Sequence, residues 1–211
     1  MTIRAICWDW NGTLLDDVDV CRQVMDRVLV AYGRAPFADR AAYRAAFRFP
    51  IRRFYADAGL GDDVYREAAA QYLDWLDERI DTASLHPGAE SVLAAVAALG
   101  IRQVLASATV TAALARQLAP HSAVRERFEE TLSISDSYGA SKRDVIAAWF
   151  ATTALQPHEV LMIGDTNHDR EIAADLGTGF VHFDAGHQSA PDGVTRIVSL
   201  PELIPHLAAQ A

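Results

Sequence analysis

The chain has 211 residues and a mass of 23.0 kDa, which is enough for one sizeable hydrophobic core or for a core with a smaller inserted unit. Of its residues 51% are hydrophobic and 22% are charged, a composition typical of a globular protein rather than a disordered or membrane-spanning one. Its formal net charge of −9 argues against nucleic acids and membrane surfaces as partners, because both bind clustered positive charge.

The first predicted strand is "IRAICWDW", residues 3–10, and it delivers Asp9 into the glycine turn "DWNGTL". Because this strand begins at Ile3, we expect no signal peptide before it, and the two cysteines are too few for a disulfide framework. We therefore expect a cytoplasmic protein with a buried thiol at Cys7.

The next interval, residues 16–85, contains only helical patterns. They are "DVDVCRQVMDRVLVAYG", "RAAYRAAF", "PIRRFYADAG" and "DDVYREAAAQYLDWLDERI". Glycine and proline end helices or form turns, and they separate these patterns at Gly33, Pro36, Pro50 and Gly59. We predict a helical cap domain over residues 16–85, inserted into a catalytic core of residues 1–15 and 86–211.

Four further strands are predicted after the insertion. They are "IRQVLASA" from Ile101, "TLSIS" from Thr131, "EVLMIGD" from Glu159 and "GFVHFD" from Gly179. A helix-like segment precedes each of them, a rhythm typical of βαβ units and of a mostly parallel sheet covered on both faces. The predicted fold class is α/β, a Rossmann-like core with an inserted α-helical cap.

Polar side chains gather where the predicted strands end, which is where open α/β sheets bind ligands. The first strand supplies Asp9, Asn11 and Thr13, and the second supplies Ser107. The remaining groups are Lys142 in the loop "YGASKRD" and two carboxylates in "GDTNHD", Asp165 and Asp169. Carboxylates are the ligands that Mg²⁺ prefers, usually together with a phosphate oxygen, so this set suits Mg²⁺-dependent phosphoryl chemistry.

These segments resemble the haloacid dehalogenase superfamily, in particular its helical-capped phosphatases of the phosphoglycolate phosphatase type. The four motifs of that superfamily occur in order over nearly the whole chain. They are "DWNGTL" for the DxDGT pattern, Ser107 for the second-motif Ser/Thr, Lys142 for the basic third motif, and "GDTNHD" for the acidic GDxxxD motif. Each motif alone is a weak signal, whereas the ordered set is a strong one.

The resemblance implies a role for each of these residues. Asp9 would be the nucleophile that forms an aspartyl-phosphate, and Lys142 would neutralise Asp9 and the phosphate. Ser107 would hydrogen-bond a phosphoryl oxygen, with Gly12 and Thr13 as further phosphate-binding residues. The predicted Mg²⁺ ligands are Asp9, the backbone carbonyl of Asn11, Asp165 and Asp169.

Asn11 departs from the family pattern, which usually has a second aspartate at this position. That aspartate protonates the leaving oxygen, a contribution of about 10²–10⁴ in rate, and an asparagine cannot provide it. Three interpretations follow. Another group, such as His168 or Asp17, replaces the acid; the substrate has a leaving group that needs little help, such as an acyl phosphate; or the protein binds phosphate without turnover.

The insertion also offers basic side chains. In "FRFPIRRFYADAG" three arginines, Arg48, Arg52 and Arg53, lie near a bend where a cap could bring them onto an anionic substrate. Arginine is abundant in this chain, so the competing interpretation is that these three side chains lie on the surface in contact with water. We include only Arg52 among the predicted substrate-binding residues. The insertion holds no lysine, since Lys142 is the only lysine in the chain, and this argues against the Schiff-base chemistry of phosphonoacetaldehyde hydrolase.

We therefore predict a Mg²⁺-dependent phosphatase that acts on a small phosphorylated metabolite through an Asp9 intermediate. The alternatives are a haloacid dehalogenase, which needs no metal, and a noncatalytic phosphate-binding protein with the same fold. The acidic pair in "GDTNHD" argues against the dehalogenase. The sequence does not specify the substrate or the oligomeric state.

Overall fold

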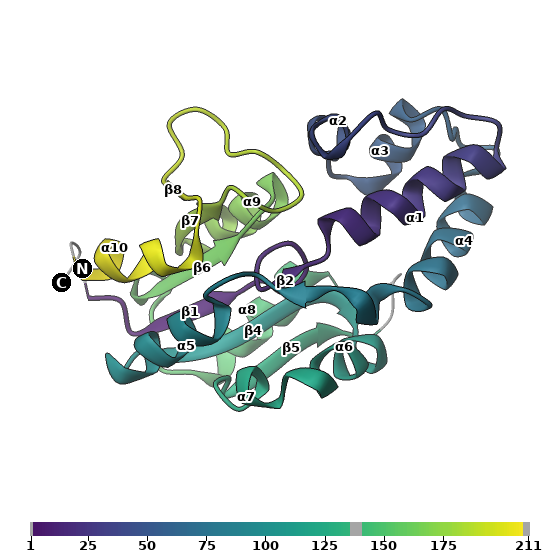
Figure 1. The fold of residues 1–211 in the computed structure, drawn as a ribbon. Coiled ribbons are helices and arrows are strands. Elements are labelled where there is room, and N and C mark those ends of the chain that lie inside the picture. The colour runs from purple at the N-terminus through teal and green to yellow at the C-terminus, as the bar shows by residue number, and fades with distance from the viewer. Residues whose placement is uncertain (1, 136–140, 209–211) are drawn as a thin grey trace.

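The computed structural model describes residues 2–135 and 141–208, so the first three residues of the "YGASKRD" segment lie outside the described residues. A six-stranded parallel sheet forms the centre of the molecule (Figure 1). Its strands, in spatial order, are β5 (Glu130–Ile134), β4 (Arg102–Val110), β1 (Ala5–Trp8), β6 (Val160–Gly164), β7 (Gly179–Phe183) and β8 (Arg196–Ile197). The predicted α/β class with a mostly parallel sheet is confirmed, and of the six strands of this sheet only the short β8 was not predicted.

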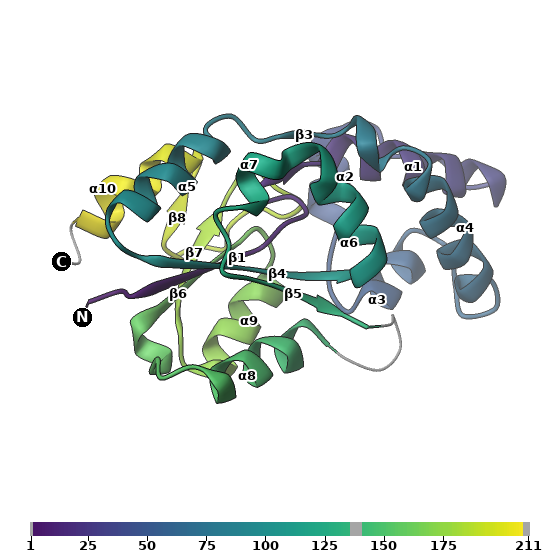
Figure 2. The same cartoon turned by 90° about the horizontal axis from the view of Figure 1, so that it is seen from below.

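Helices cover both faces of the sheet, as Figure 2 shows. On one face lie α5 (Ala89–Ala98), α6 (Thr111–Leu118), α7 (Ser122–Arg125) and α10 (Leu203–Ala208), and on the other lie α8 (Lys142–Thr152) and α9 (Asn167–Leu176). Single turns of 3₁₀-helix are η1 (Ile80–Thr82), η2 (Ala119–His121), η3 (Pro157–Glu159) and η4 (Leu200–Glu202).

The central strand β1 shows why helices must cover both faces of the sheet. All four of its residues are buried, and their side chains alternate between the two faces. Ile6 and Trp8 belong to the hydrophobic cluster on the side of α5, whereas Ala5 and Cys7 belong to the cluster on the side of α8. Burial of apolar surface on both faces stabilises this arrangement by roughly 25 cal/mol for each Å² removed from water.

The interval between β1 and α5 forms a separate layer of helices at one end of the sheet (Figure 1). We call it the helical group; it consists of α1 (Val18–Ala31), α2 (Arg40–Ala46), α3 (Ile51–Asp57) and α4 (Tyr65–Asp77). These helices enclose a hydrophobic cluster of their own, which includes Met25, Tyr43 and Phe54. The four predicted helices correspond to these four elements.

A two-stranded ribbon joins the helical group to the sheet. Its strands, β2 (Leu15–Asp16) and β3 (Ser84–Leu85), pair antiparallel with Leu15 opposite Leu85. The ribbon lies at the carboxyl end of β1, so the helical group stands over the edge of the sheet where the polar strand ends meet. Within the described residues, no helix combines the length and the apolar composition needed to cross a membrane.

Candidate active site

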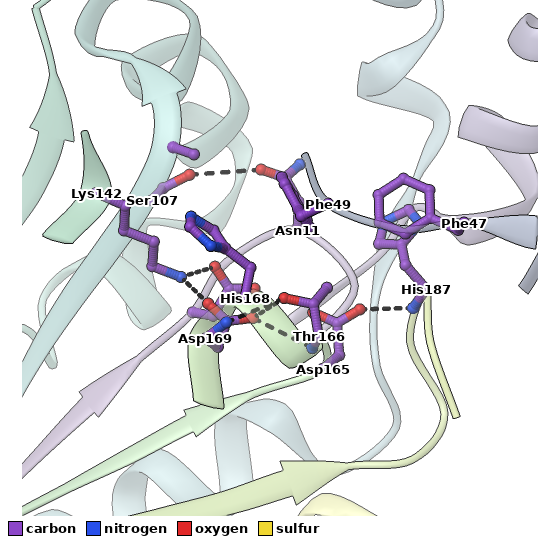
Figure 3. A pocket seen from close by; sticks show the side chains of 12 residues that line it. Asn11, Phe47, Phe49, Ser107, Lys142, Asp165, Thr166, His168, Asp169 and His187 are labelled. Carbon is purple, nitrogen blue, oxygen red and sulfur yellow. Dashed lines mark hydrogen bonds and ion pairs between the residues drawn. The ribbon is translucent and has the colours of Figure 1, made fainter. Parts of the chain in front are cut away.

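A small pocket of about 120 Å³ lies at the carboxyl ends of β1, β4 and β6 (Figure 3). Residues from the strand ends, from the first turns of α8 and α9, from the loop between α2 and α3 and from the loop after β7 line it. They are Asp9, Asn11, Phe47, Phe49, Ser107, Ala108, Lys142, Asp165, Thr166, His168, Asp169 and His187. Six of the nine residues predicted for the site therefore meet in one pocket.

Lys142 lies between two carboxylates at the floor of this pocket. Its Nζ donates to Oδ1 of Asp9 at 2.5 Å and to Oδ1 of Asp169 at 2.6 Å. The side chain is only 4% exposed. Burial alone would lower the pKa of Lys142, but the charges of Asp169 and Asp9 and their hydrogen bonds raise that pKa above its usual range. The ammonium group is therefore a fixed positive charge beside Asp9.

Local sequence explains how Lys142 and Asp169 are presented. Both lie in the first turn of a helix, and a capping box fixes each helix start. In α8 the cap residue is Ser141, and in α9 the cap residue Thr166 donates through Oγ1 to Oδ2 of Asp169 at 2.5 Å. This leaves the other oxygen of Asp169, Oδ1, for Lys142.

Asp165 is completely buried and is held by two donors. Thr13 donates through Oγ1 to Oδ1 at 3.2 Å, and the backbone N–H of His187 donates to Oδ2 at 2.5 Å. Gly12 (φ +77°) and Gly186 pack so closely on the carboxylate that a Cβ at either position would collide with it. Thr13 and Gly12 thus position Asp165 and do not line the pocket.

The three pocket carboxylates are close enough to share a cation. Asp9, Asp165 and Asp169 each offer an oxygen within 4.8 Å of the others. Burial is the main influence that raises the pKa of Asp9 and of Asp165, to about 6 for Asp165, and the neighbouring Asp169 adds to it in both cases. A divalent cation would relieve the repulsion between these carboxylates. An all-oxygen donor set suits Mg²⁺, so the residues present fit that ion.

Asn11 is held by both ends of its amide. Its Nδ2 donates to Oδ2 of Asp17 at 2.9 Å, and its Oδ1 accepts from Oγ1 of Thr109 at 2.8 Å. The hydroxyl of Ser107 lies 3.5 Å from the same oxygen and accepts from the backbone N–H of Thr109 at 3.0 Å (Figure 3). The Asn11 side chain therefore links the end of β1 to the end of β4.

The backbone N–H of Gly12, considered above as a phosphate donor, also points to Asp17. It donates to Oδ1 of Asp17 at 2.8 Å. That contact occupies the N–H, so the structure does not place it in the pocket with Ser107.

His187 is a pocket residue that the sequence did not reveal. Its Nε2 lies 3.2 Å from Oδ1 of Asp17 and its Nδ1 lies 3.2 Å from the hydroxyl of Tyr43. Burial lowers the pKa of His187, but the charge and hydrogen bond of Asp17 outweigh burial and raise the pKa to about 9. The only signal in the sequence was its place a few residues after the last long predicted strand, "GFVHFD".

Aromatic rings form the wall that faces the helical group. Phe47 and Phe49 come from the loop between α2 and α3, and they stack on His187 and His168. The predicted substrate residue Arg52 is not part of the lining. It is 60% exposed and pairs with Asp62 at 2.8 Å, while its guanidinium lies over Tyr65.

Comparison with known proteins agrees with this arrangement. A family model described as haloacid dehalogenase-like hydrolase matches residues 3–177. A phosphoglycolate phosphatase of Cereibacter sphaeroides is 27% identical over 193 residues, which cover 89% of this chain and 88% of that protein. The tyrosine-protein kinase PtkA of Mycobacterium tuberculosis is 26% identical over 209 residues, which cover 95% of this chain and 71% of that protein.

Solved structures share the fold as well. A haloacid dehalogenase-like family hydrolase from Streptococcus pneumoniae superposes with a TM-score of 0.82 at 20% identity, and the match covers 97% of this chain and 98% of that one. At this identity the likeness concerns the fold alone. The family match, by contrast, spans the strands that carry Asp9, Ser107 and Asp165. The chain belongs to the haloacid dehalogenase-like hydrolase family, and it is a hydrolase.

Proposed function

We propose that the protein is a Mg²⁺-dependent phosphatase that hydrolyses a small phosphorylated metabolite through an aspartyl-phosphate at Asp9. One observation carries the proposal. The ammonium group of Lys142 bridges Asp9 and Asp169, and Asp165 lies beside them at the floor of a pocket formed by strand ends. Phosphoryl transfer needs a positioned nucleophile and compensation of the phosphoryl charges, and this arrangement offers both.

Three pocket residues have defined tasks in the phosphoryl transfer. A carboxylate oxygen of Asp9 attacks phosphorus, and Lys142 neutralises the charge of Asp9 and of the transferring group. The hydroxyl of Ser107, buried at the end of β4, donates to a phosphoryl oxygen. Water then hydrolyses the acyl phosphate and restores Asp9.

The metal ligands in this scheme are Asp9, Asp165, Asp169 and the backbone carbonyl of Asn11. A bound Mg²⁺ would supply a Lewis-acid charge beside the phosphate. Thr13 and the backbone N–H of His187 hold Asp165 in place for that role. Asn11 retains a carbonyl oxygen whatever its side chain, so the loss of the second aspartate does not remove this ligand.

Residues 16–85 would act as a cap over a core formed by residues 1–15 and 86–211, excluding water and selecting the substrate. Contacts between the two parts support this assignment. The guanidinium of Arg44 donates to the backbone carbonyls of Asp184 and Gln188, and the amide of Gln188 donates to the carbonyl of Phe47 at 2.7 Å. The pocket volume of about 120 Å³ lies below the 300–1,000 Å³ of sites for drug-sized ligands, which favours a small metabolite.

The phosphatase relative in Cereibacter sphaeroides supports this reaction type. The proposed setting is the cytoplasm, with a small phosphorylated metabolite as substrate and with neither nucleic acid nor membrane as partner. The negative net charge is consistent with that choice.

The test is phosphate release from a panel of aryl, alkyl, sugar and acyl phosphates and 2-phosphoglycolate, with Mg²⁺ and with EDTA. The Asp9→Asn protein serves as the blank. We expect release that disappears in this variant and with EDTA. Turnover of haloacids that is indifferent to EDTA would support a dehalogenase instead. Binding of Mg²⁺ and phosphate without turnover of any substrate would support a noncatalytic protein.

A further inference from the structure

Four rings line one part of the pocket, and we call them the ring wall: Phe47, Phe49, His168 and His187. Phe47 stacks on His187 with ring centroids 4.9 Å apart and an interplanar angle of 29°. Phe49 stacks on His168 at 4.7 Å and 25°. The two phenylalanines meet edge to face at 5.7 Å. The loop between α2 and α3 and the core thus contribute two rings each to a chain of ring contacts.

The ring wall keeps an open edge. Phe49 is 38% exposed, although a phenylalanine in a well-packed position is usually buried. Its neighbour Phe47 is half-buried, whereas Phe54 on α3 is 1% exposed. An exposed aromatic edge at the mouth of a small pocket offers stacking area to a planar group.

The described residues on this side of the pocket offer no unpaired positive charge. Lys142 is the only lysine or arginine among the described residues that line it, and Asp9 and Asp169 already engage its ammonium group. The imidazolium of His187 is already paired with Asp17. A leaving group with a carboxylate or a second phosphate would therefore find no unpaired counter-charge there.

The arginines of the loop and helix nearby do not supply this charge. Arg48 pairs with Asp57 at 3.1 Å, and Arg53 lies 3.8 Å from the same carboxylate. Arg52 pairs with Asp62 on the surface. Each of the three arginines that the sequence suggested could contact an anionic substrate is therefore already near a carboxylate of the helical group or its loops.

Asn11 limits the leaving group in a second, independent way. Its amide is neutral, and its two ends are held by Asp17 and Thr109. The residue has no proton to give to a departing oxygen. A phenol, with a pKa of about 10, departs as its anion far more readily than an alkyl alcohol, whose pKa is near the value of about 15.7 for water.

We propose that the natural substrate is the phosphate monoester of a hydroxyl on a single aromatic ring that carries no further anionic group. The ring stacks on Phe49 and Phe47 while the phosphate lies between Lys142 and Ser107. This assignment rests on the proposed phosphatase function and names its substrate class. Two observations lead to it: the described residues of the ring wall offer no unpaired cation, and Asn11 provides no acid.

The chemical step balances without a further reactant. An oxygen of Asp9 forms a bond to phosphorus while phosphorus loses its bond to the ester oxygen that is attached to the aromatic ring. The electron pair of that bond leaves with the oxygen as a phenolate, which takes a proton from solvent. One water then cleaves the acyl phosphate, so that phenol and phosphate are released and the Asp9 carboxylate is restored.

The experiment compares kcat/KM for four phosphates that vary ring and leaving group separately. Phenyl phosphate has a ring and a good leaving group, whereas benzyl phosphate has a ring and an alkyl leaving group. Acetyl phosphate has a good leaving group without a ring, and 2-phosphoglycolate has neither. We expect phenyl phosphate to be the best substrate, with 2-phosphoglycolate at least about 100-fold lower because it lacks the acid assistance worth about 10²–10⁴.

Two variants separate recognition of the ring from general damage. Phe49→Leu keeps an apolar side chain at a partly exposed position, and we expect it to raise KM for phenyl and benzyl phosphate about five- to tenfold relative to its effect on acetyl phosphate. The matched control is Phe150→Leu on α8, outside the pocket. We expect it to leave the ratio of KM for the two ring substrates to KM for acetyl phosphate as in the wild type.

The outcomes distinguish this inference from the proposed function. Asp9-dependent hydrolysis with 2-phosphoglycolate equal to or better than phenyl phosphate, or an equal effect of Phe49→Leu on all four substrates, would overturn the aryl assignment and leave a phosphatase. No Asp9-dependent release from any of the four would overturn both.

Discussion

The side chains of Asn11 and Asp17 are joined by a hydrogen bond of 2.9 Å from Nδ2 to Oδ2. Asp17 is 1% exposed, and its other oxygen, Oδ1, accepts from the backbone N–H of Gly12 and faces Nε2 of His187. Burial opposes ionisation, but the charge of His187 and the hydrogen bonds from His187 and Asn11 lower the pKa of Asp17 below its usual range. A neutral amide is therefore the group that fits beside this anion at position 11.

The substitution Asn11→Asp tests what the amide excludes. A carboxyl group beside the Asp17 carboxylate would have a raised pKa because two negative charges would meet in a buried place, so it would keep its proton near neutral pH. We expect hydrolysis of alkyl phosphates to rise by about tenfold or more, within the 10²–10⁴ that a positioned acid contributes, and aryl phosphates to respond less. The measurement is the alkyl-to-aryl ratio of kcat/KM.

Asn11→Ala is the control for that substitution, since it breaks the hydrogen bond to Asp17 without adding an acid. A rise in both variants would assign the effect to loss of the amide rather than to the new acid. A fall in Asn11→Asp alone would show that the amide serves another task in turnover.

Removal of the charge at Lys142 should weaken the fold as well as stop turnover. In Lys142→Met the buried carboxylates of Asp9 and Asp169 lose their partner, and breaking a buried ion pair typically costs about 3–5 kcal/mol. We expect a loss of that size in the free energy of unfolding by urea. Arg143→Met is the matched control, because Arg143 is exposed and pairs only with exposed carboxylates, so its loss should be about 1 kcal/mol or less. Equal losses in the two variants would contradict the buried ion pair.

Stability should fall at alkaline pH because of His187. Its folded-state pKa of about 9 lies above the ordinary value of 6.5, so its pairing with Asp17 contributes fully below pH 6.5 and is lost as the pH rises through about 9. The contribution is roughly 3 kcal/mol from the size of that shift. We expect urea midpoints of the wild type to fall between pH 6 and pH 9.5, and those of His187→Gln to fall less. Parallel curves for the two proteins would show that His187 does not titrate in this range.

Binding of Mg²⁺ should stabilise the folded protein, because the three pocket carboxylates come together only in that state. A ligand at 100 times its Kd contributes about 2.7 kcal/mol. We expect Mg²⁺ to raise the melting temperature of the wild type and to leave that of Asp165→Asn unchanged. Asp175→Asn, at an exposed carboxylate on α9, is the control and should respond as the wild type does. A response of Asp165→Asn equal to that of the wild type would place the ion elsewhere.

The sequence predicted the strands well because each is a short apolar run that ends in glycine, aspartate or serine. β1 and β6 are buried on both faces, so their composition alone identifies them, and the carboxyl ends of parallel strands meet at one edge. That geometry brings Asp9, Ser107 and Asp165 together, as expected from their positions. The two-residue strands β2, β3 and β8 were not predicted, since they are too short to show a period.

The rest of the pocket depends on contacts between distant segments. Phe47 and Phe49 look like ordinary apolar residues of a helical insertion, and only the fold brings them against His187 and His168. No local pattern distinguishes Arg52, which pairs with Asp62, from an arginine that faces a ligand. Thr13 was expected to touch phosphate, but in the structure it holds Asp165, because its hydroxyl points to the neighbouring strand end.

The only lysine of the chain is 4% exposed and lies at the first turn of α8. A lysine-specific protease can therefore cut this protein at one peptide bond, the one between Lys142 and Arg143. The bond becomes accessible only when the start of α8 unfolds, which also separates Lys142 from Asp9 and Asp169. The rate at which the intact chain turns into two fragments thus reports how often the floor of the pocket opens, without any label or substrate.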